Sequence, residues 1–144
     1  MQVAKRKLEY ADWAATPSDG KQYEIVDGSL VVNPSPRLFH QRWSKRLQRQ
    51  LEAFFETPGS AAEVFNAPVG VVLGPHDIVE PDIVVVADRS SQIARLAIEG
   101  APLLVVEILS PSSIVHDRRV KFERYRLLGV RHCWILDGDA RSLE

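Results

Sequence analysis

Residues 103–110 read Leu-Leu-Val-Val-Glu-Ile-Leu-Ser, and this stretch decides the fold that we expect. A short apolar run rich in β-branched residues predicts a strand that is buried on both faces, as in the centre of a sheet. Side chains alternate along a strand, so Glu107 shares a face with Val105 and Leu109. A buried carboxylate is costly unless it is paired, bound to a metal or protonated. Glu107 therefore needs either an Arg or Tyr from a neighbouring element or a functional cation.

A second stretch of similar character, residues 80–86, reads Glu-Pro-Asp-Ile-Val-Val-Val. Pro81 lacks a backbone donor and suits the first position of a strand, which places Asp82 at the strand entrance. If the two strands are neighbours, Asp82 and Glu107 can share one divalent cation. Mg²⁺ is commonly bound by one or two carboxylates, with waters and substrate phosphate as the other ligands. The alternative for Asp82 is a strand-entry residue that bonds a turn.

Composition narrows the class of protein. The chain has 144 residues, of which 45% are hydrophobic, and this predicts one domain with a core of its own. Its 18 Lys and Arg against 19 Asp and Glu give a net charge of −1, so nucleic-acid binding would require a local basic patch. The single cysteine, Cys133, excludes an internal disulfide and is expected to be an inert core residue. No apolar run resembles a signal peptide or a spanning helix, so we expect a cytoplasmic protein without membrane contact.

The rest of the chain alternates between strand and helix patterns. Asp27-Gly28 between apolar runs predicts a hairpin of residues 23–26 and 30–32. Further predicted elements are a helix at 10–15, a strand pair at 63–66 and 69–73 around Ala67-Pro68, a turn at 74–77, a short helix near 93–98, a helix at 113–128 and a strand at 132–136. The final strand–helix–strand unit is long enough for a crossover between parallel strands. We therefore expect an α/β (α+β) fold with a mixed sheet flanked by helices.

Residues 37–56 have the period of an amphipathic helix. The apolar stripe expected to pack on the sheet consists of Trp43, Leu47, Leu51 and Phe54. A basic stripe on the adjoining face consists of Arg42, Lys45, Arg46 and Arg49. The basic stripe is either an ordinary solvated face or a rail that contacts nucleic-acid phosphates. His40, just inside this helix, has the position of a cap-region or interface histidine.

The helix at 113–128 places Asp117, Lys121, Tyr125 and Leu128 nearly in line. A line that mixes ions with Tyr and Leu is typical of the edge of a packed face. Two interpretations of Lys121 remain open on these grounds. It either forms an exposed pair with Asp117 or leans back over the end of the Glu107 strand.

Several motifs together resemble the Uma2 (DUF820) family, which belongs to the PD-(D/E)XK, restriction-endonuclease-like nucleases. They are Tyr-Glu-Ile-Val-Asp-Gly (23–28), His40, Pro81-Asp82, Val-Glu-Ile-Leu-Ser-Pro-Ser (106–112), Asp117-Arg118 with Lys121, and Gly-Val-Arg (129–131) with Trp-Ile-Leu-Asp (134–137). The resemblance covers roughly residues 8–144. It implies a single domain with a restriction-endonuclease-like core, in which the chain ends before the strands that family members usually carry after Trp-Ile-Leu-Asp.

The resemblance also implies roles for individual residues. Asp82 and Glu107 would be the metal-binding acids, with the Ile108 carbonyl as a further ligand of Mg²⁺ or Mn²⁺. The parent motif has its lysine two residues after the second acid, where this chain has Leu109. Uma2 proteins look as if this lysine has moved to the following helix, which assigns the role to Lys121. Glu24 matches an additional acid near the N-terminus, although on its own its position in a hairpin strand carries no functional signal.

Two functions from different classes are consistent with these observations. The first is a metal-dependent endonuclease that cleaves DNA, with the basic stripe on the helix at 37–56 holding the duplex backbone. The second is a non-catalytic nucleic-acid-binding or regulatory module of the same fold. The joint presence of Asp82, Glu107 and Lys121 favours the first, because a site without a catalytic role is free to lose them. The near-neutral charge keeps the second open, and a homodimer is open under both.

Overall fold

The computed structural model describes residues 5–94, 96–110 and 115–144, and its strands form two mixed sheets. The first sheet has the order β2-β1-β5-β4-β7 and comprises β1 (Gln22–Val26), β2 (Ser29–Asn33), β4 (Val71–Gly74), β5 (Asp77–Val79) and β7 (Ile98–Glu99). The second has the order β10-β9-β8-β6-β3 and comprises β3 (Glu63–Asn66), β6 (Ile83–Val86), β8 (Leu104–Ile108), β9 (His132–Asp137) and β10 (Ser142–Leu143). The helices are α1 (Tyr10–Ala14), α2 (Leu38–Phe55), α3 (Arg89–Gln92) and α4 (Val115–Leu127). The predicted α/β class with helices flanking mixed sheets is confirmed.

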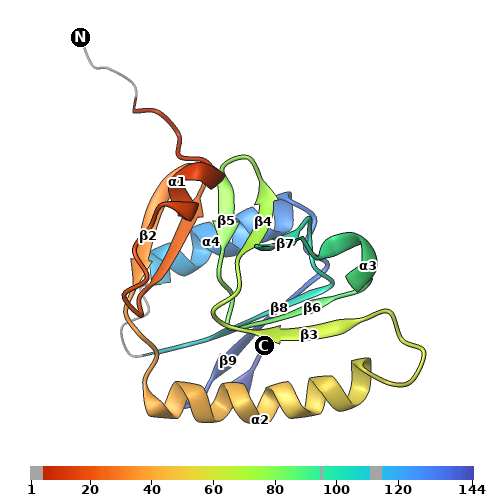
Figure 1. Ribbon diagram of the computed structural model, residues 1–144. Helices are drawn as coiled ribbons and strands as arrows, with labels where there is room; N and C mark the ends of the chain where they lie inside the picture. The colour runs from red at the N-terminus through yellow and green to blue at the C-terminus, as the bar shows by residue number, and fades with distance from the viewer. Residues whose placement is uncertain (1–4, 95, 111–114) are drawn as a thin grey trace.

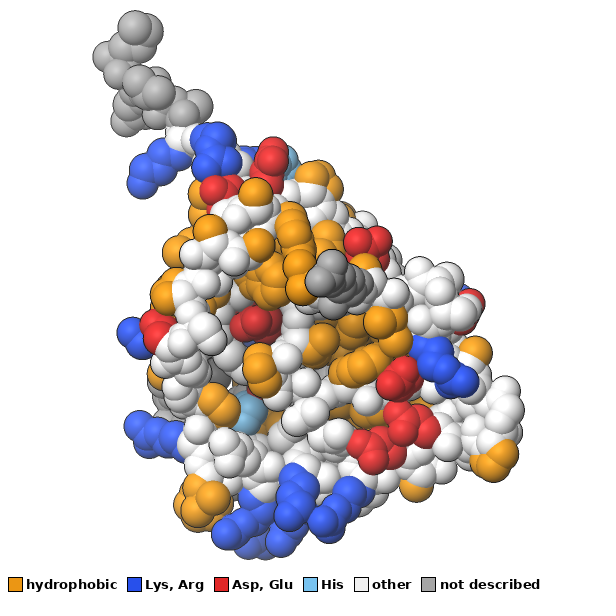
Figure 2. Space-filling view, in the orientation of Figure 1, with side chains coloured by type: hydrophobic (Ala, Val, Ile, Leu, Met, Phe, Trp, Pro, Cys, Tyr) orange, Lys and Arg blue, Asp and Glu red, His pale blue; other side chains and the backbone are white. Residues whose placement is uncertain are grey.

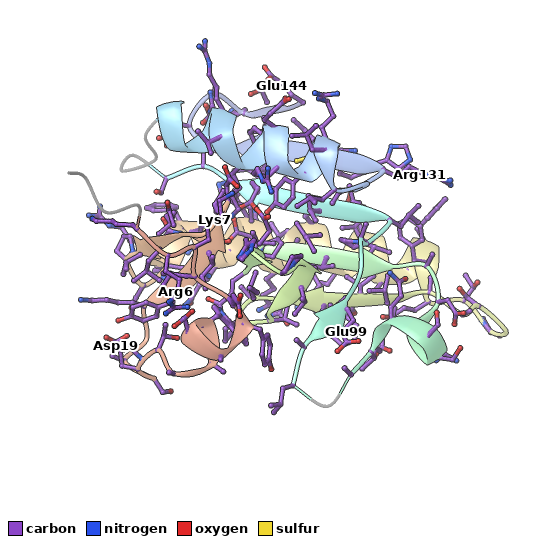
Figure 3. All side chains as sticks on the ribbon, turned by 90° about the horizontal axis from the view of Figure 1, so that it is seen from above. Arg6, Lys7, Asp19, Glu99, Arg131 and Glu144 are labelled. Atoms are coloured by element: carbon purple, nitrogen blue, oxygen red, sulfur yellow. The ribbon has the colours of Figure 1, made fainter. Side chains whose placement is uncertain are left out.

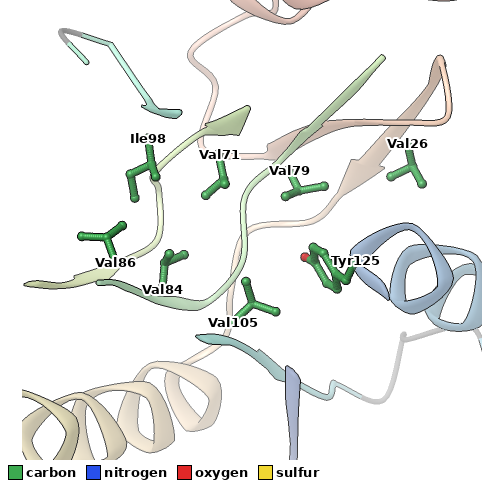
Figure 4. Close-up of a cluster of buried hydrophobic side chains, with 8 residues drawn as sticks. All are labelled: Val26, Val71, Val79, Val84, Val86, Ile98, Val105 and Tyr125. Atoms are coloured by element: carbon green, nitrogen blue, oxygen red, sulfur yellow. The ribbon is translucent and has the colours of Figure 1, made fainter. Parts of the chain in front are cut away.

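The second sheet lies in the middle of the molecule, with α2 below it and the first sheet and α4 above it in Figure 1. Its α2 side carries alternate residues of β6 and β8, among them Ile83 and Val106, packed against Leu51. Its other side carries the intervening residues, among them Val105, packed against the first sheet and Tyr125 of α4 (Figure 4). Both faces of the second sheet are therefore covered, which accounts for the continuous apolar runs of β6 and β8.

The central strand is β8, as the sequence predicts. It pairs antiparallel with β6 and parallel with β9, and the chain between β8 and β9 passes through α4. The predicted hairpin is also present as β1 and β2. At its turn Asp27 and Gly28 have φ angles of 47° and 80°. Positive φ at both central residues is the requirement of the hairpin turn that Asp-Gly favours.

One predicted strand pairing and the predicted bounds of two local elements are wrong. Residues 63–66 and 69–73 do not form a strand pair, because β3 pairs with β6 in one sheet and β4 pairs with β5 and β7 in the other. The predicted turn at 74–77 ends inside β5, which begins at Asp77. The short helix lies at Arg89–Gln92 rather than near 93–98, and it is capped by Asp88, whose side chain accepts a hydrogen bond from the Ser90 N–H. Alternation identifies strands but not their partners, since partners are chosen by long-range packing.

The apolar stripe of α2 was predicted correctly at three of its positions and wrongly at the fourth. Leu51 is 5% exposed, and Trp43 and Leu47 pack partly buried beside it. Phe54 is 75% exposed, and Phe55 packs against the sheet in its place. Positions four residues apart follow one face of a helix, so the stripe that starts at Trp43 continues to Phe55.

This difference gives a test of the packing with a matched control on one helix. Leu51→Ala should lower the free energy of unfolding by about 2–5 kcal/mol, because it removes buried methyl groups and leaves a cavity. Phe54→Ala should change it by less than about 0.5 kcal/mol, because exposed side chains contribute little. Urea unfolding followed by circular dichroism measures both. Equal losses in the two variants would contradict the assigned face of α2.

The part of the chain that the structure describes contains no helix long and apolar enough to cross a membrane.

Candidate active site

Strands β6 and β8 bring Asp82 and Glu107 together. The antiparallel register places Ile83 opposite Val106, so the next pair along the strands is Asp82 and Glu107. One carboxylate oxygen of Asp82, Oδ2, accepts a hydrogen bond of 2.7 Å from the backbone N–H of Ile108. Asp82 is 5% exposed, and this hydrogen bond ties the entrance of β6 to the end of β8. Two neighbouring strands therefore each supply an acid at the same end of the sheet.

His40 of α2 holds the other oxygen of Asp82. Its Nε2 lies 2.9 Å from Asp82 Oδ1. Burial lowers the pKa of His40, but the hydrogen bond to Asp82 and the charges of Asp82 and Glu107 raise it by more, so the net shift is upward. The sequence suggested a cap-region or interface histidine, and His40 instead fixes the orientation of an acid in the site.

Glu107 has two partners, both from α4. The Lys121 ammonium lies 2.7 Å from Glu107 Oε1, and the Tyr125 hydroxyl donates a hydrogen bond of 2.5 Å to the same oxygen. Both contacts are to Oε1, and the second carboxylate oxygen takes part in neither. Burial, together with the nearby charges of Asp82 and Glu24, raises the pKa of Glu107, while Lys121 acts in the opposite direction. A tyrosine partner for Glu107 was one alternative that the sequence left open, and Tyr125 is that partner, together with Lys121.

Lys121 also contacts Glu24, and so it connects the two sheets. Its Nζ lies 2.7 Å from Glu24 Oε2 and 3.0 Å from Oε1. Glu24 is 1% exposed and further accepts hydrogen bonds from the Asn33 side chain and the Glu80 backbone N–H. Burial lowers the pKa of Lys121, but the charges of Glu107 and Glu24 outweigh it, so the pKa is raised and the amine stays charged.

The exposed-pair interpretation of Lys121 is wrong, because its side chain is only 15% exposed and lies against Glu24 and Glu107. Its suggested partner in that interpretation, Asp117, has a side chain outside the described part of the chain. A single ammonium held between two carboxylates is rigidly placed. It can stabilise negative charge that develops beside Glu107.

The structure also contains a buried ion pair that the sequence analysis missed. Asp77 of β5 is 1% exposed, and both of its oxygens accept hydrogen bonds from Arg124 of α4, at 2.9 and 2.7 Å. The same carboxylate accepts a bond from the backbone N–H of Asp27 in the β1–β2 turn. Figure 3, seen from above, shows α4 lying along one side of the strands, with Arg131 beyond its end. Arg124 lies three residues after Lys121 on the same face of α4.

The basic stripe of α2 is solvent-exposed at all four positions, Arg42, Lys45, Arg46 and Arg49. Lys and Arg side chains gather along the lower edge of the molecule, over α2, in Figure 2. The guanidinium of Arg42 lies 5.5 Å from the Phe39 ring centre, and that of Arg46 lies 5.9 Å from the Trp43 ring centre. Exposure is consistent with both a solvated face and a phosphate rail.

The donor set at the acids fits one class of metal site. Among the described residues, no group of three or more His, Cys, Asp and Glu side chains is arranged to hold a metal ion. Two carboxylates on adjacent strands do fit Mg²⁺, which keeps several waters and takes one or two protein carboxylates together with substrate phosphate.

An α/β core with two acids on adjacent strands beside a lysine is what the resemblance to restriction-endonuclease-like nucleases implies, and comparison with known proteins identifies the family. The model of the Uma2 family, described as "Putative restriction endonuclease", matches residues 8–144. The chain belongs to the Uma2 family, as its motifs predicted.

One similar solved structure is a crystal structure described as "a putative nuclease belonging to DUF820" from Anabaena variabilis. The TM-score is 0.78 at 19% sequence identity, and the alignment covers 94% of this chain and 77% of that chain. This likeness shows a shared fold. No curated protein matches the chain.

Proposed function

We propose that the protein is a metal-dependent endonuclease that hydrolyses phosphodiester bonds in DNA, in the cytoplasm. The observation that carries the proposal is the convergence of Asp82, Glu107 and Lys121 at one end of β6 and β8. Ionic groups held largely out of water are costly to keep, so three of them together favour a functional role over a structural one. Membership of the Uma2 family supports nuclease activity in the same direction.

Asp82, Glu107 and the Ile108 carbonyl would hold Mg²⁺ or Mn²⁺. When bound, such an ion polarises a phosphoryl oxygen and lowers the pKa of a bound water. The other parts of the site act through the chain's own residues. His40 and the Ile108 N–H fix both oxygens of Asp82, and Tyr125 fixes one oxygen of Glu107. These contacts orient the acids before substrate arrives.

Lys121 has the catalytic role in this proposal, because its ammonium lies beside Glu107 and keeps its charge. It would orient the attacking water or stabilise the negative charge that develops on the phosphoryl oxygens. Glu24 would be a positioning residue, since it contacts Lys121 from the other sheet and holds the ammonium in place.

Plasmid cleavage in Mg²⁺ or Mn²⁺ tests the proposal. Wild-type protein should nick or linearise the plasmid, and EDTA should stop the reaction. Glu107→Gln should lower the rate by about 10²–10³-fold or more, because the amide keeps the shape of the side chain but not its charge. Arg126→Gln is the matched control, since Arg126 lies one residue from Tyr125 on the exposed side of α4 and should leave the rate unchanged.

The outcome also separates the two classes of function. A folded wild-type protein that binds DNA without cleaving it in either metal would overturn the endonuclease proposal. It would leave the non-catalytic nucleic-acid-binding module of the same fold as the function.

In this proposal the basic stripe of α2 contacts the DNA backbone. The described first turn of α2 contains no acidic residue, so the positive end of the helix dipole adds to the basic charge. Lys45→Ala and Arg49→Ala should each weaken binding to all sequences and reduce the slope of log K against log salt by about 1. Arg131→Ala, an exposed arginine after α4, should change neither. Fluorescence anisotropy across a salt series measures the slopes, and unchanged slopes in the α2 variants would show a merely solvated face.

A further inference from the structure

Two large apolar side chains stand exposed at the start of α2. Leu38 is 69% exposed and Phe39 is 70% exposed. The stripe that packs α2 on the sheet does not include either residue. Hydrophobic side chains lie at the lower left of Figure 2, next to the Lys and Arg side chains that gather over α2. Leu38 and Phe39 together form an exposed apolar tip at the start of α2.

The apolar tip lies beside the candidate active site. His40, the residue after Phe39, contacts Asp82 at 2.9 Å. Consecutive residues of a helix are only about 1.5 Å apart along its axis, so Phe39 is in the same turn as the residue that orients an acid of the site. A ligand bound at this turn of α2 would therefore lie close to Asp82.

The charge around Phe39 indicates the chemistry of the occupant. Arg42 lies over the ring at 5.5 Å, and the basic stripe continues along the helix from it. At the other end of α2, Phe54 is just as exposed, at 75%, but its neighbours in the chain include Glu52 and Glu56. A polyanion is attracted to the Phe39 end of the helix and repelled from the Phe54 end.

We propose that Phe39 is a stacking platform for an unpaired nucleobase beside the phosphate that is cleaved. The proposal rests on the proposed function and names its substrate class: DNA with an unpaired or displaced nucleotide, rather than a continuous duplex. An exposed aromatic ring flanked by arginines is the arrangement with which proteins bind single-stranded nucleic acid, the ring for the base and the cations for the backbone. Such a platform accepts any base, because every base has a stacking face.

Binding in EDTA tests this without cleavage. The probes are a fluorescent single strand, the same strand in a continuous duplex, and a duplex with one 2-aminopurine in a single-nucleotide bulge. Wild-type protein should prefer the single strand and the bulge to the duplex and should quench the 2-aminopurine. Phe39→Ala should weaken binding to the unpaired probes about 5- to 100-fold and lose the quenching, with little change for the duplex. Phe39→Trp should keep both properties, and Phe54→Ala should behave as wild type.

Three results would overturn the proposal. They are equal losses on paired and unpaired probes, quenching that survives Phe39→Ala, and a wild-type homodimer in sedimentation that Phe39→Ala dissolves, since this last result would make the apolar tip an interface between two copies. An absence of cleavage tests the endonuclease proposal and not the stacking platform. A protein that shows the Phe39-dependent preference for unpaired probes, yet cleaves nothing in Mg²⁺ or Mn²⁺, refutes the endonuclease proposal and supports the stacking platform.

Discussion

Replacing Lys121 with methionine is expected to abolish DNA cleavage and also to lower the free energy of unfolding by about 3–5 kcal/mol. The ammonium lies 2.7 Å from both Glu24 and Glu107, and Glu24 is 1% exposed. Removing one partner of a buried ionic group leaves the other charges without compensation, which is the source of the cost. A methionine fills the space of the lysine stem but donates no hydrogen bond. Lys121→Ala adds a cavity and should be worse.

A second substitution separates the catalytic effect from the structural one. Glu24→Gln combined with Lys121→Met removes one charge of each sign from the cluster, so most of the lost stability should return. Cleavage should stay absent, because no ammonium is left beside Glu107. Lys121→Arg should also fail in cleavage, because a planar guanidinium does not replace a compact ammonium. Plasmid cleavage and urea unfolding, measured on the same preparations, check both statements. An active double variant would return the catalytic role to an unassigned residue.

The sequence was sufficient to predict the centre of this fold. Residues 104–108 form the central strand β8, whose run of β-branched and leucine side chains is typical of a strand covered on both faces. Glu107 interrupts this run and Asp82 stands at the entrance of β6, and a carboxylate in such apolar surroundings already requires a partner. The convergence of the two acids followed from the expectation that their strands are neighbours, and the register of β6 and β8 has that relation.

The sequence could not predict that Lys121 lies largely out of water, and the reason is physical. The line of Asp117, Lys121, Tyr125 and Leu128 fits a solvated face as well as a packed edge. What decides between them is Glu24, which lies 97 residues away in the chain and approaches α4 only because the β1–β2 hairpin joins the first sheet. Tyr125 was missed as the partner of Glu107 for the same reason. Its hydroxyl needs an acceptor once the ring is buried, and Glu107 supplies it.

The short strands were the weakest part of the sequence analysis. Strand β5 contains only Asp77, Ile78 and Val79, and β7 and β10 are shorter still. Elements of two or three residues have too few positions for alternation to be visible. Asp77 therefore looked like part of a turn, and its ion pair with Arg124 could not be inferred without knowing which strand faces α4.

The same ion pair predicts that Arg124→Met lowers the free energy of unfolding by about 3 kcal/mol. Asp77 is buried and loses both of its charged hydrogen bonds from Arg124, while its bond from the Asp27 backbone remains. The figure is at the low end for a broken buried pair, because the Arg124 side chain is 23% exposed and water partly replaces it. Asp77→Asn combined with Arg124→Met removes the uncompensated carboxylate charge and should restore part of the lost free energy of unfolding. Arg126→Met, in an exposed pair with Glu123, is the control and should leave the unfolding transition where it is.

The Arg124 variant should also slow cleavage, although Arg124 touches neither acid of the site. It ties α4 to β5 and to the hairpin turn, and Lys121 lies one helical turn before it on the same face. Loosening that connection lets the ammonium drift from Glu24 and Glu107, and catalysis is sensitive to displacements of about 1 Å. Cleavage rates measured well below the unfolding transition should therefore fall in Arg124→Met and recover in part with Asp77→Asn. A full rate in a destabilised Arg124→Met would show that Glu24 alone is enough to position Lys121.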